Sequence, residues 1–250
     1  MTIVSGVRIL AAPCCGAHYA APRYRSMNFM AFEYWTDGWR EGSLMPNDEG
    51  LRRCTCGQFI LMKETVEIET AETSDLTRID RVPEEQLAAC IAVADREELE
   101  VAARIEYWHY LNHFYRNSYR QHRDAEEQAT KASWEAANPD RRTRWDKLRG
   151  RKAPEYHRPP KSPFTYPAFE PTSEQLQNMK RLSEILQAWN SESQPRHNPL
   201  TLAELFREQG RFDEALVVIL AIDDADGDVT CKLITKLCGE KQSAPMRYRM

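Results

Sequence analysis

The amino-acid sequence predicts an α+β protein, with a small β-rich module at the N-terminus and a mostly helical region behind it. Turn residues repeatedly interrupt β-prone segments before residue 70, whereas apolar residues recur at helical spacing after Pro83. We therefore divide the chain into a cysteine-bearing module at 1–70, a helical hairpin at 83–150, a Pro-rich basic linker at 151–172 and a C-terminal helical region at 173–240.

The N-terminal module contains β-prone segments at 7–10, 29–35 and 58–62. Asp-Gly and Glu-Gly pairs, together with the segment 46–50, supply the turns between them. The stretch 26–39 carries a heavy aromatic load for so short a segment. It fits either the core of the module or an exposed face that binds a peptide or stacks bases.

Two cysteine–glycine turns accompany these segments, Pro13-Cys14-Cys15-Gly16 and Cys54-Thr55-Cys56-Gly57. They resemble the paired knuckles of a zinc ribbon, in which two thiolates three residues apart hold zinc and a glycine lets the backbone turn. The first cysteine of each knuckle would fall at Ala12 and Arg53, so this chain departs from the family's pattern.

The resemblance implies a closed structural zinc site rather than a catalytic one, because a catalytic zinc needs an open position. The predicted ligands are Cys14, Cys15, Cys54 and Cys56, with His18 as a candidate fourth ligand if the adjacent cysteines do not both bind. The alternatives are a module without metal, whose thiols pack as small apolar groups, and redox chemistry at the same thiols.

Composition restricts the class of protein. Apolar residues make up 42% of the chain and charged residues 29%, and the net charge is −4. That charge argues against a surface that neutralises nucleic acid as a whole, although it permits a local basic patch. No apolar run approaches the ~20 residues of a membrane-spanning helix, and 3–12 is too short for a signal peptide. We expect a cytoplasmic protein without membrane contact, whose paired cysteines indicate metal before disulfides.

The first part of the helical region predicts a helix that opens at Pro83 and a longer one at 96–137, ended by Asn138-Pro139. Aromatic residues surround the longer helix on more than one side, which predicts burial against the module, the linker or a second subunit. On this helix Glu106, His109 and His113 would share a face.

A metalloenzyme centred on His109 and His113 is the third and least favoured hypothesis, an outsider. A di-iron set needs a second Glu-x-x-His copy, and a zinc-protease helix needs glutamate where Tyr110 stands. No nucleophile–base pair, phosphate loop or pair of catalytic carboxylates is recognisable. We predict no catalytic residue.

The segment 141–161 is strongly basic, with nine Lys and Arg residues against two acids. Interspersed aromatic rings make it a candidate nucleic-acid contact, and a solvated basic linker is the alternative. The residues that would carry that contact are Arg141, Arg142, Arg144, Lys147, Arg149, Arg151 and Lys152.

The C-terminal region predicts a helix that starts near Ser173, a helical hairpin at 201–220 and a short helix around 230–237. The hairpin resembles a tetratricopeptide repeat through Ala203, Phe206, Gly210, Phe212 and Ala215. That resemblance covers about 20 residues and implies a protein-contact role for Phe206 and Phe212. A hairpin that merely completes the protein's own helical body is the alternative, because a lone repeat cannot bury its faces.

The sequence does not reveal a specific biochemical activity. The favoured hypothesis is a non-catalytic, zinc-binding adaptor in a bacterial-type cytosol that binds another protein or a second copy of itself. A nucleic-acid-associated factor that uses 141–161 is the runner-up.

Overall fold

The computed structural model describes residues 2–42, 49–140, 142–190, 197–222 and 228–248, and it confirms the α+β fold. Small antiparallel sheets come first and helices dominate the rest of the chain. The chain forms two compact units, one made of 1–112 and 169–250 and the other of 113–168. Among the described helices, none has the length and apolarity that crossing a membrane requires.

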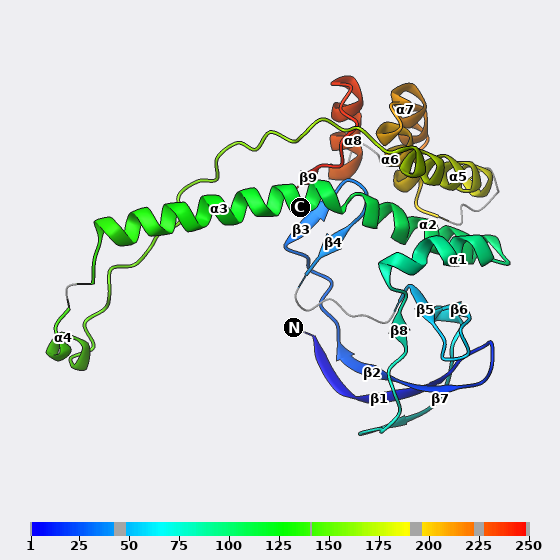
Figure 1. Ribbon diagram of the computed structural model, residues 1–250, viewed down its shortest axis with the longest axis horizontal. Helices are drawn as coiled ribbons and strands as arrows, with labels where there is room; N and C mark the ends of the chain where they lie inside the picture. The colour runs from blue at the N-terminus through cyan, green and yellow to red at the C-terminus, as the bar shows by residue number, and fades with distance from the viewer. Residues whose placement is uncertain (1, 43–48, 141, 191–196, 223–227, 249–250) are drawn as a thin grey trace. The chain divides into compact units, whose positions relative to one another are not determined.

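In the described part of the first unit, the strands form three antiparallel sheets of three strands each, with the orders β2-β1-β7, β4-β3-β9 and β6-β5-β8 (Figure 1). The predicted segment 7–10 lies in the first strand, residues 59–61 of the predicted 58–62 form the sixth, and only the end of 29–35 is a strand. The predicted turn at 46–50 lies largely outside the described residues. The strands are β1 (Ile3–Ala11), β2 (His18–Ser26), β3 (Glu33–Trp35), β4 (Arg40–Glu41), β5 (Leu51–Arg53), β6 (Phe59–Leu61), β7 (Val66–Ala71), β8 (Asp80–Arg81) and β9 (Arg247–Tyr248).

The helices of the first unit follow the predicted spacing closely. Pro83 precedes a short 3₁₀ turn, Glu84–Gln86, that leads into the first helix. The predicted helix near Ser173, the hairpin and the short last helix are all present, and Gly210 takes a φ of +74° at the hairpin turn. The helices are α1 (Leu87–Val93), α2 (Glu97–Leu111), α5 (Ser173–Asn190), α6 (Pro199–Glu208), α7 (Phe212–Leu220) and α8 (Val229–Gly239), and a further 3₁₀ turn lies at Met62–Glu64.

Helix α2 is buried on two sides, as its aromatic content predicts. Val101 and Trp108 belong to a core that they share with α5, α6, α7 and α8. Leu99, Ala103 and Tyr107 belong to a second core, together with α1 and the sheet that contains β5 and β6. The helix therefore joins the cysteine-bearing module to the C-terminal helices within one unit.

The predicted single helix at 96–137 is wrong in one respect, because it is divided at Asn112 into α2 and α3 (His113–Ala137). The side chain of Asn112 is fully buried. Its Nδ2 donates to Asp37 Oδ2 at 3.1 Å and to both carboxylate oxygens of Glu208, while its Oδ1 accepts from Gln175 Nε2 at 2.9 Å. Side-chain bonds to three distant segments hold this residue in place. No helix-breaking residue near Asn112 marks the division in the sequence.

Buried charge concentrates beside Asn112. Glu204 and Arg207 of α6 form an ion pair with both side chains fully buried and 2.6 Å between Arg207 Nη2 and Glu204 Oε1. Arg207 also donates to the carbonyl oxygens of Gln242 and Ala244. The same guanidinium thus ties α6 to the C-terminal tail, which continues into β9 and pairs with β3.

Glu208 is the third buried charged residue of this cluster. Its Oε2 accepts a hydrogen bond of 2.7 Å from Trp108 Nε1. Burial, followed by the nearby carboxylates of Glu204 and Asp37, raises the pKa of Glu208 well above its ordinary value, against the opposing effect of Arg207. These buried groups have a structural role, because they join α2, α6 and the β3–β4 turn.

The second unit consists of α3, the short helix α4 (Arg144–Leu148) and a returning segment, 151–168, that has no regular secondary structure. The ring of Phe164 meets that of Tyr119 of α3 edge-on and the ring of Tyr166 stacks on it, with centroids 5.4 Å and 6.3 Å away. Further along, the ring of Tyr156 lies 5.6 Å from that of Trp134. The predicted Pro-rich linker therefore packs along α3, as a strap, in its part up to residue 168.

Candidate metal centre

The two cysteine turns are the connections of two β-hairpins. Residues 12–17 join β1 to β2, and residues 54–58 join β5 to β6. In the first turn Gly16 N donates to Ala12 O at 2.9 Å, and in the second Gly57 N donates to Cys54 O at 2.8 Å. Both glycines have positive φ, +71° and +91°. A side chain in that region is strained, so glycine allows each turn to close tightly.

The hairpins bring all four predicted thiols together. The ligand atoms of Cys14, Cys15, Cys54 and Cys56 lie within 4.8 Å of one another. Sulfur of Cys14 is 3.5 Å from that of Cys56, and sulfur of Cys15 is 3.4 Å from that of Cys54. Four sulfurs around one zinc at its usual bond length are about 3.8 Å apart, so small shifts would place all four on one ion.

The environment of the four thiols differs across the cluster. Cys54 is buried and Cys14 is partly buried, whereas Cys15 and Cys56 are exposed. Leu10, Ile60 and Met62 are among the buried residues of the small core on which Cys14 and Cys54 pack. The metal would therefore lie at the surface edge of this core.

Tyr19 connects the two hairpins beneath the thiols, and it was not predicted. Its buried hydroxyl lies 3.2 Å from Cys54 Sγ and accepts a hydrogen bond of 2.8 Å from Thr55 N. Because the contact joins β2 to the turn of a different hairpin, no spacing in the sequence marks Tyr19. Hydrogen bonds of this kind orient the ligands of a metal site.

Hydrogen bonding also controls the ionisation of the thiols. Burial acts to raise the pKa of Cys54, but bonds from the Tyr19 hydroxyl and the Cys56 amide, and then from the thiols of Cys14 and Cys15, lower it to about 6. Burial and the neighbouring thiols raise the pKa of Cys14. The thiolate is the form of cysteine that binds metal, and the lowered pKa of Cys54 favours that form.

His18 is not a member of this group of potential ligands within the described residues. It is exposed at the first position of β2. Four thiols already supply the number of ligands that a tetrahedral site needs, so the adjacent cysteines leave no ligand position for it. Ala12 is buried in the small core and Arg53 is exposed, and neither supplies a ligand.

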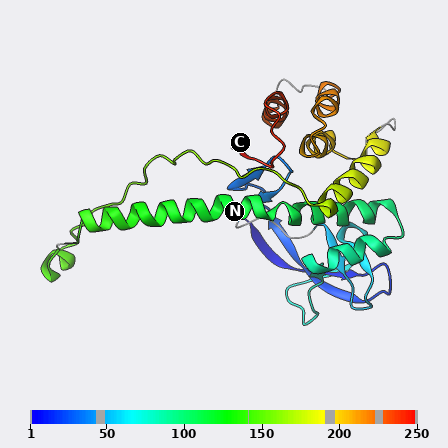
Figure 2. The same cartoon turned by 45° about the horizontal axis from the view of Figure 1, so that its top comes forward.

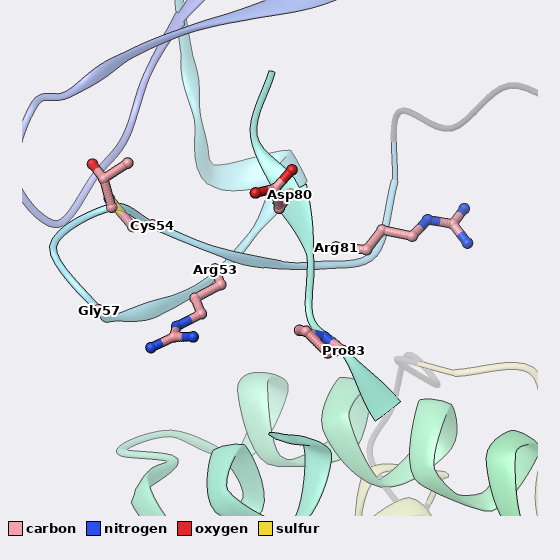
Figure 3. Close-up of a pocket in the computed structure, with 7 residues that line it drawn as sticks. Arg53, Cys54, Gly57, Asp80, Arg81 and Pro83 are labelled. Atoms are coloured by element: carbon pink, nitrogen blue, oxygen red, sulfur yellow. The ribbon is translucent and has the colours of Figure 1, made fainter. Parts of the chain in front are cut away.

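A hollow of about 260 Å³ adjoins the second cysteine turn, between β5, β8 and residues 54–57. Figure 3 shows the side chains of Arg53 and Arg81 extending away from one another, with Asp80 on β8. Polar groups that bind a small ligand converge on it. Arg53 and Arg81 do not converge in this way.

In the structure, His109 and Glu106 of the hypothetical metalloenzyme make contacts that join structural elements. His109 Nε2 donates to the carbonyl oxygen of Asp37 at 2.9 Å, and the His109 ring stacks on Trp108. Glu106 Oε1 accepts from the amide of Leu51 at 3.0 Å. His113 follows the division at Asn112 and no longer continues the same helix. Within the described residues, none of the three belongs to a group suited to metal binding.

The residues predicted to contact a protein have different positions in the hairpin. Phe206 is buried in the helical core, where the guanidinium of Arg211 lies 4.2 Å from the centre of its ring. Phe212 is partly buried and packs against the same core. Both therefore hold α6 and α7 together, and their proposed role in partner binding stays a prediction.

Large apolar side chains are exposed elsewhere, in the segment 27–32 that follows β2. Trp35, in the aromatic stretch 26–39, is fully buried, so that stretch contributes to the core through its second half. We name the segment 27–32 the apolar loop. Its exposed members are Met27, Phe29, Met30 and Phe32.

The basic residues of the nucleic-acid alternative lie on and around α4. Arg141 lies outside the described residues, and so does the side chain of Lys147. Arg144, Arg149, Arg151 and Lys152 are exposed, and Arg142 is partly exposed.

The fold and the thiol cluster define a class: an α+β protein with four cysteines, from two β-hairpin turns, arranged so that they could hold one metal ion. No protein-family model, curated protein or solved structure matches the chain.

Proposed function

We propose that the protein is a non-catalytic zinc-binding interaction protein, in which a structural zinc clasps the two cysteine turns. The observation that carries this proposal is the convergence of four sulfur atoms within 4.8 Å. Thiolates favour zinc, and four of them fill its tetrahedral coordination, which leaves no open position for a substrate or an activated water. The ion would join β1–β2 to β5–β6 in a module too small to bury a large core.

Metal content of the purified protein is expected to be one zinc per chain. Replacing Cys14 and Cys15 together by serine, or Cys54 and Cys56 together, should reduce it to near zero, since each turn supplies half of the ligands. The matched control is Cys231→Ser/Cys238→Ser, which removes two buried thiols of α8 that lie outside the cluster.

Elemental analysis of the wild-type protein and these three variants provides the measurement. Zinc that persists in either turn variant, or zinc that disappears equally in the α8 control, would contradict a site shared by the two turns. Purification in the presence of iron and zinc together tests the identity of the metal, because four thiolates also suit iron.

The interaction part of the proposal rests on the apolar loop. Four large apolar side chains within six residues are between 45% and 76% exposed. Such patches on soluble proteins commonly mark interaction sites, and methionine adapts its shape to a partner surface. We propose a second protein with a complementary apolar surface as the occupant.

A photo-crosslinking amino acid at Met30, in the full chain, is expected to give one discrete adduct with a protein of different mass. The same group at Val217, which is 67% exposed on α7, is the matched control and should not give that adduct. The identified partner, once purified, should bind Met30→Ser/Phe32→Ser at least about tenfold more weakly, as for anchor residues. Unchanged affinity, or an adduct made only of two copies of this chain, would refute a distinct protein partner.

A further inference from the structure

The second unit carries a concentration of positive charge at the end of α3. We name residues 142–152 the basic tip; they contain six Lys or Arg residues and one acid, in a chain whose net charge is −4. Helix α4 lies in this segment, beyond the C-terminal end of α3 (Figures 1 and 2). Local excess charge of this kind is the electrostatic footprint of a polyanion contact.

Two of these cations, Arg142 and Arg151, form bonds within the segment around α4. Arg142 Nε and Nη2 bond to the two carboxylate oxygens of Asp140 at 2.8 Å and 2.9 Å, and its Nη1 donates to the carbonyl oxygen of Arg151 at 2.7 Å. Arg151 pairs with Asp146, whose carboxylate accepts from the amide and hydroxyl of Thr143. These bonds give the basic tip a defined local conformation.

Other cations of the basic tip remain available. Arg144, Arg149 and Lys152 are exposed, and none of their side chains forms an ion pair or hydrogen bond with another described residue. Two of the three are arginines, whose planar guanidinium groups bind phosphate through two donors at once. An acidic partner is therefore favoured at this surface.

An indole ring lies among these charges. Trp145 of α4 is 71% exposed. Tryptophan is normally well buried, and an exposed aromatic ring beside arginines is the arrangement on which unpaired bases stack. Stacking requires a base whose face is free, which favours a single strand over a duplex.

The strap, which returns from the basic tip, packs along α3. Ser162 N donates to Glu126 Oε1 at 2.8 Å, and Arg158 pairs with Glu127. Together with the aromatic contacts of Tyr119 and Trp134, these bonds fix the strap at several points along the helix. The strap is therefore packed on α3, whereas the basic side chains of the tip are exposed.

We propose that the basic tip binds single-stranded nucleic acid. Arg144, Arg149 and Lys152 would contact the phosphates, and a base would stack on Trp145. An anionic membrane is the competing polyanion, but the apolar area offered to it is small: α4 has five residues and its large exposed apolar side chains are Trp145 and Leu148. Membrane binding by an interfacial helix scales with buried apolar area.

The test measures the binding of fluorescently labelled oligouridine and oligodeoxythymidine, each of about 20 nucleotides, to the full chain by anisotropy. Affinity is expected to fall as salt rises, with a slope of about −0.7 for each phosphate neutralised on a single strand. The variant Arg144→Ser/Arg149→Ser/Lys152→Ser should bind at least about tenfold more weakly and with a shallower salt slope. Trp145→Ala should weaken binding by about tenfold without changing the slope.

The matched control is Lys63→Ser/Lys180→Ser/Lys232→Ser, which removes three exposed cations outside the second unit and changes the net charge equally. It should keep wild-type affinity. Circular dichroism and melting curves identify any variant that fails to fold, and in that case Trp145→Ala alone decides. The proposal is overturned by absent binding at low salt, by equal losses in both triple variants, or by tip-dependent binding to phosphatidylserine vesicles with none to either oligonucleotide. The two oligonucleotides distinguish RNA from DNA as the source of the strand.

Discussion

Replacing Arg207 by alanine is expected to lower the free energy of unfolding by about 3–5 kcal/mol, because it leaves a buried carboxylate without its partner. The side chains of Arg207 and Glu204 are both fully buried. The substitution also removes the donors to the carbonyl oxygens of Gln242 and Ala244, which hold the C-terminal tail. Urea unfolding followed by circular dichroism measures the loss.

An exposed pair in another helix provides the control. Lys236 and Glu240 of α8 have side chains 69% and 51% exposed, so Lys236→Ala should cost less than about 1 kcal/mol. The double variant Glu204→Leu/Arg207→Met should recover part of the loss, since it leaves neither member of the pair buried without its partner. If Arg207→Ala behaved like Lys236→Ala, Arg207 would not hold α6 to the tail.

Removing the metal is expected to expose four thiols and to loosen both cysteine turns. The chain has seven cysteines, of which Cys90, Cys231 and Cys238 are buried in the helical part of the first unit. In the metal-bound protein few thiols should react with a thiol reagent under native conditions. After chelation the count should rise to four, and denaturation should release the other three.

The size of this effect follows from the coupling of zinc binding to folding, which is worth about 10–16 kcal/mol in small zinc modules at neutral pH. Hydrogen exchange should therefore accelerate strongly at the amides of Gly16 and Gly57, which close the two turns. Amides within α5 and α6 are the internal control and should keep their protection. Four reactive thiols before chelation, or unchanged exchange after it, would contradict a metal that holds the turns.

Most of the helices could be predicted from the sequence because their determinants lie within a few residues. The helix near Ser173 and the hairpin around Gly210 follow from apolar spacing and one positive-φ position. The division at Asn112 could not, because the side-chain bonds that hold it come from Asp37, Gln175 and Glu208. Helix propensity depends on neighbouring residues and therefore does not reveal partners that are distant in the sequence.

The strands likewise differ in whether their determinants are near or distant in the sequence. Segments of β1 and β6 have β-prone residues of their own. Strands β8 and β9 have two residues each and exist through pairing with β5 and β3. Such short segments carry too little periodicity to be predicted before their partners are known.

By itself the sequence determined the α+β class, most of the helices and the four cysteines as the residues to examine. The tertiary structure decided that their sulfur atoms meet, that Tyr19 lies beneath Cys54, and that Arg207 is buried. Glycine turns and helical spacing depend on residues that are close together in the sequence, so they can be predicted from it. The thiol cluster depends on two hairpins separated by about forty residues, and only their packing on a common core sets that distance.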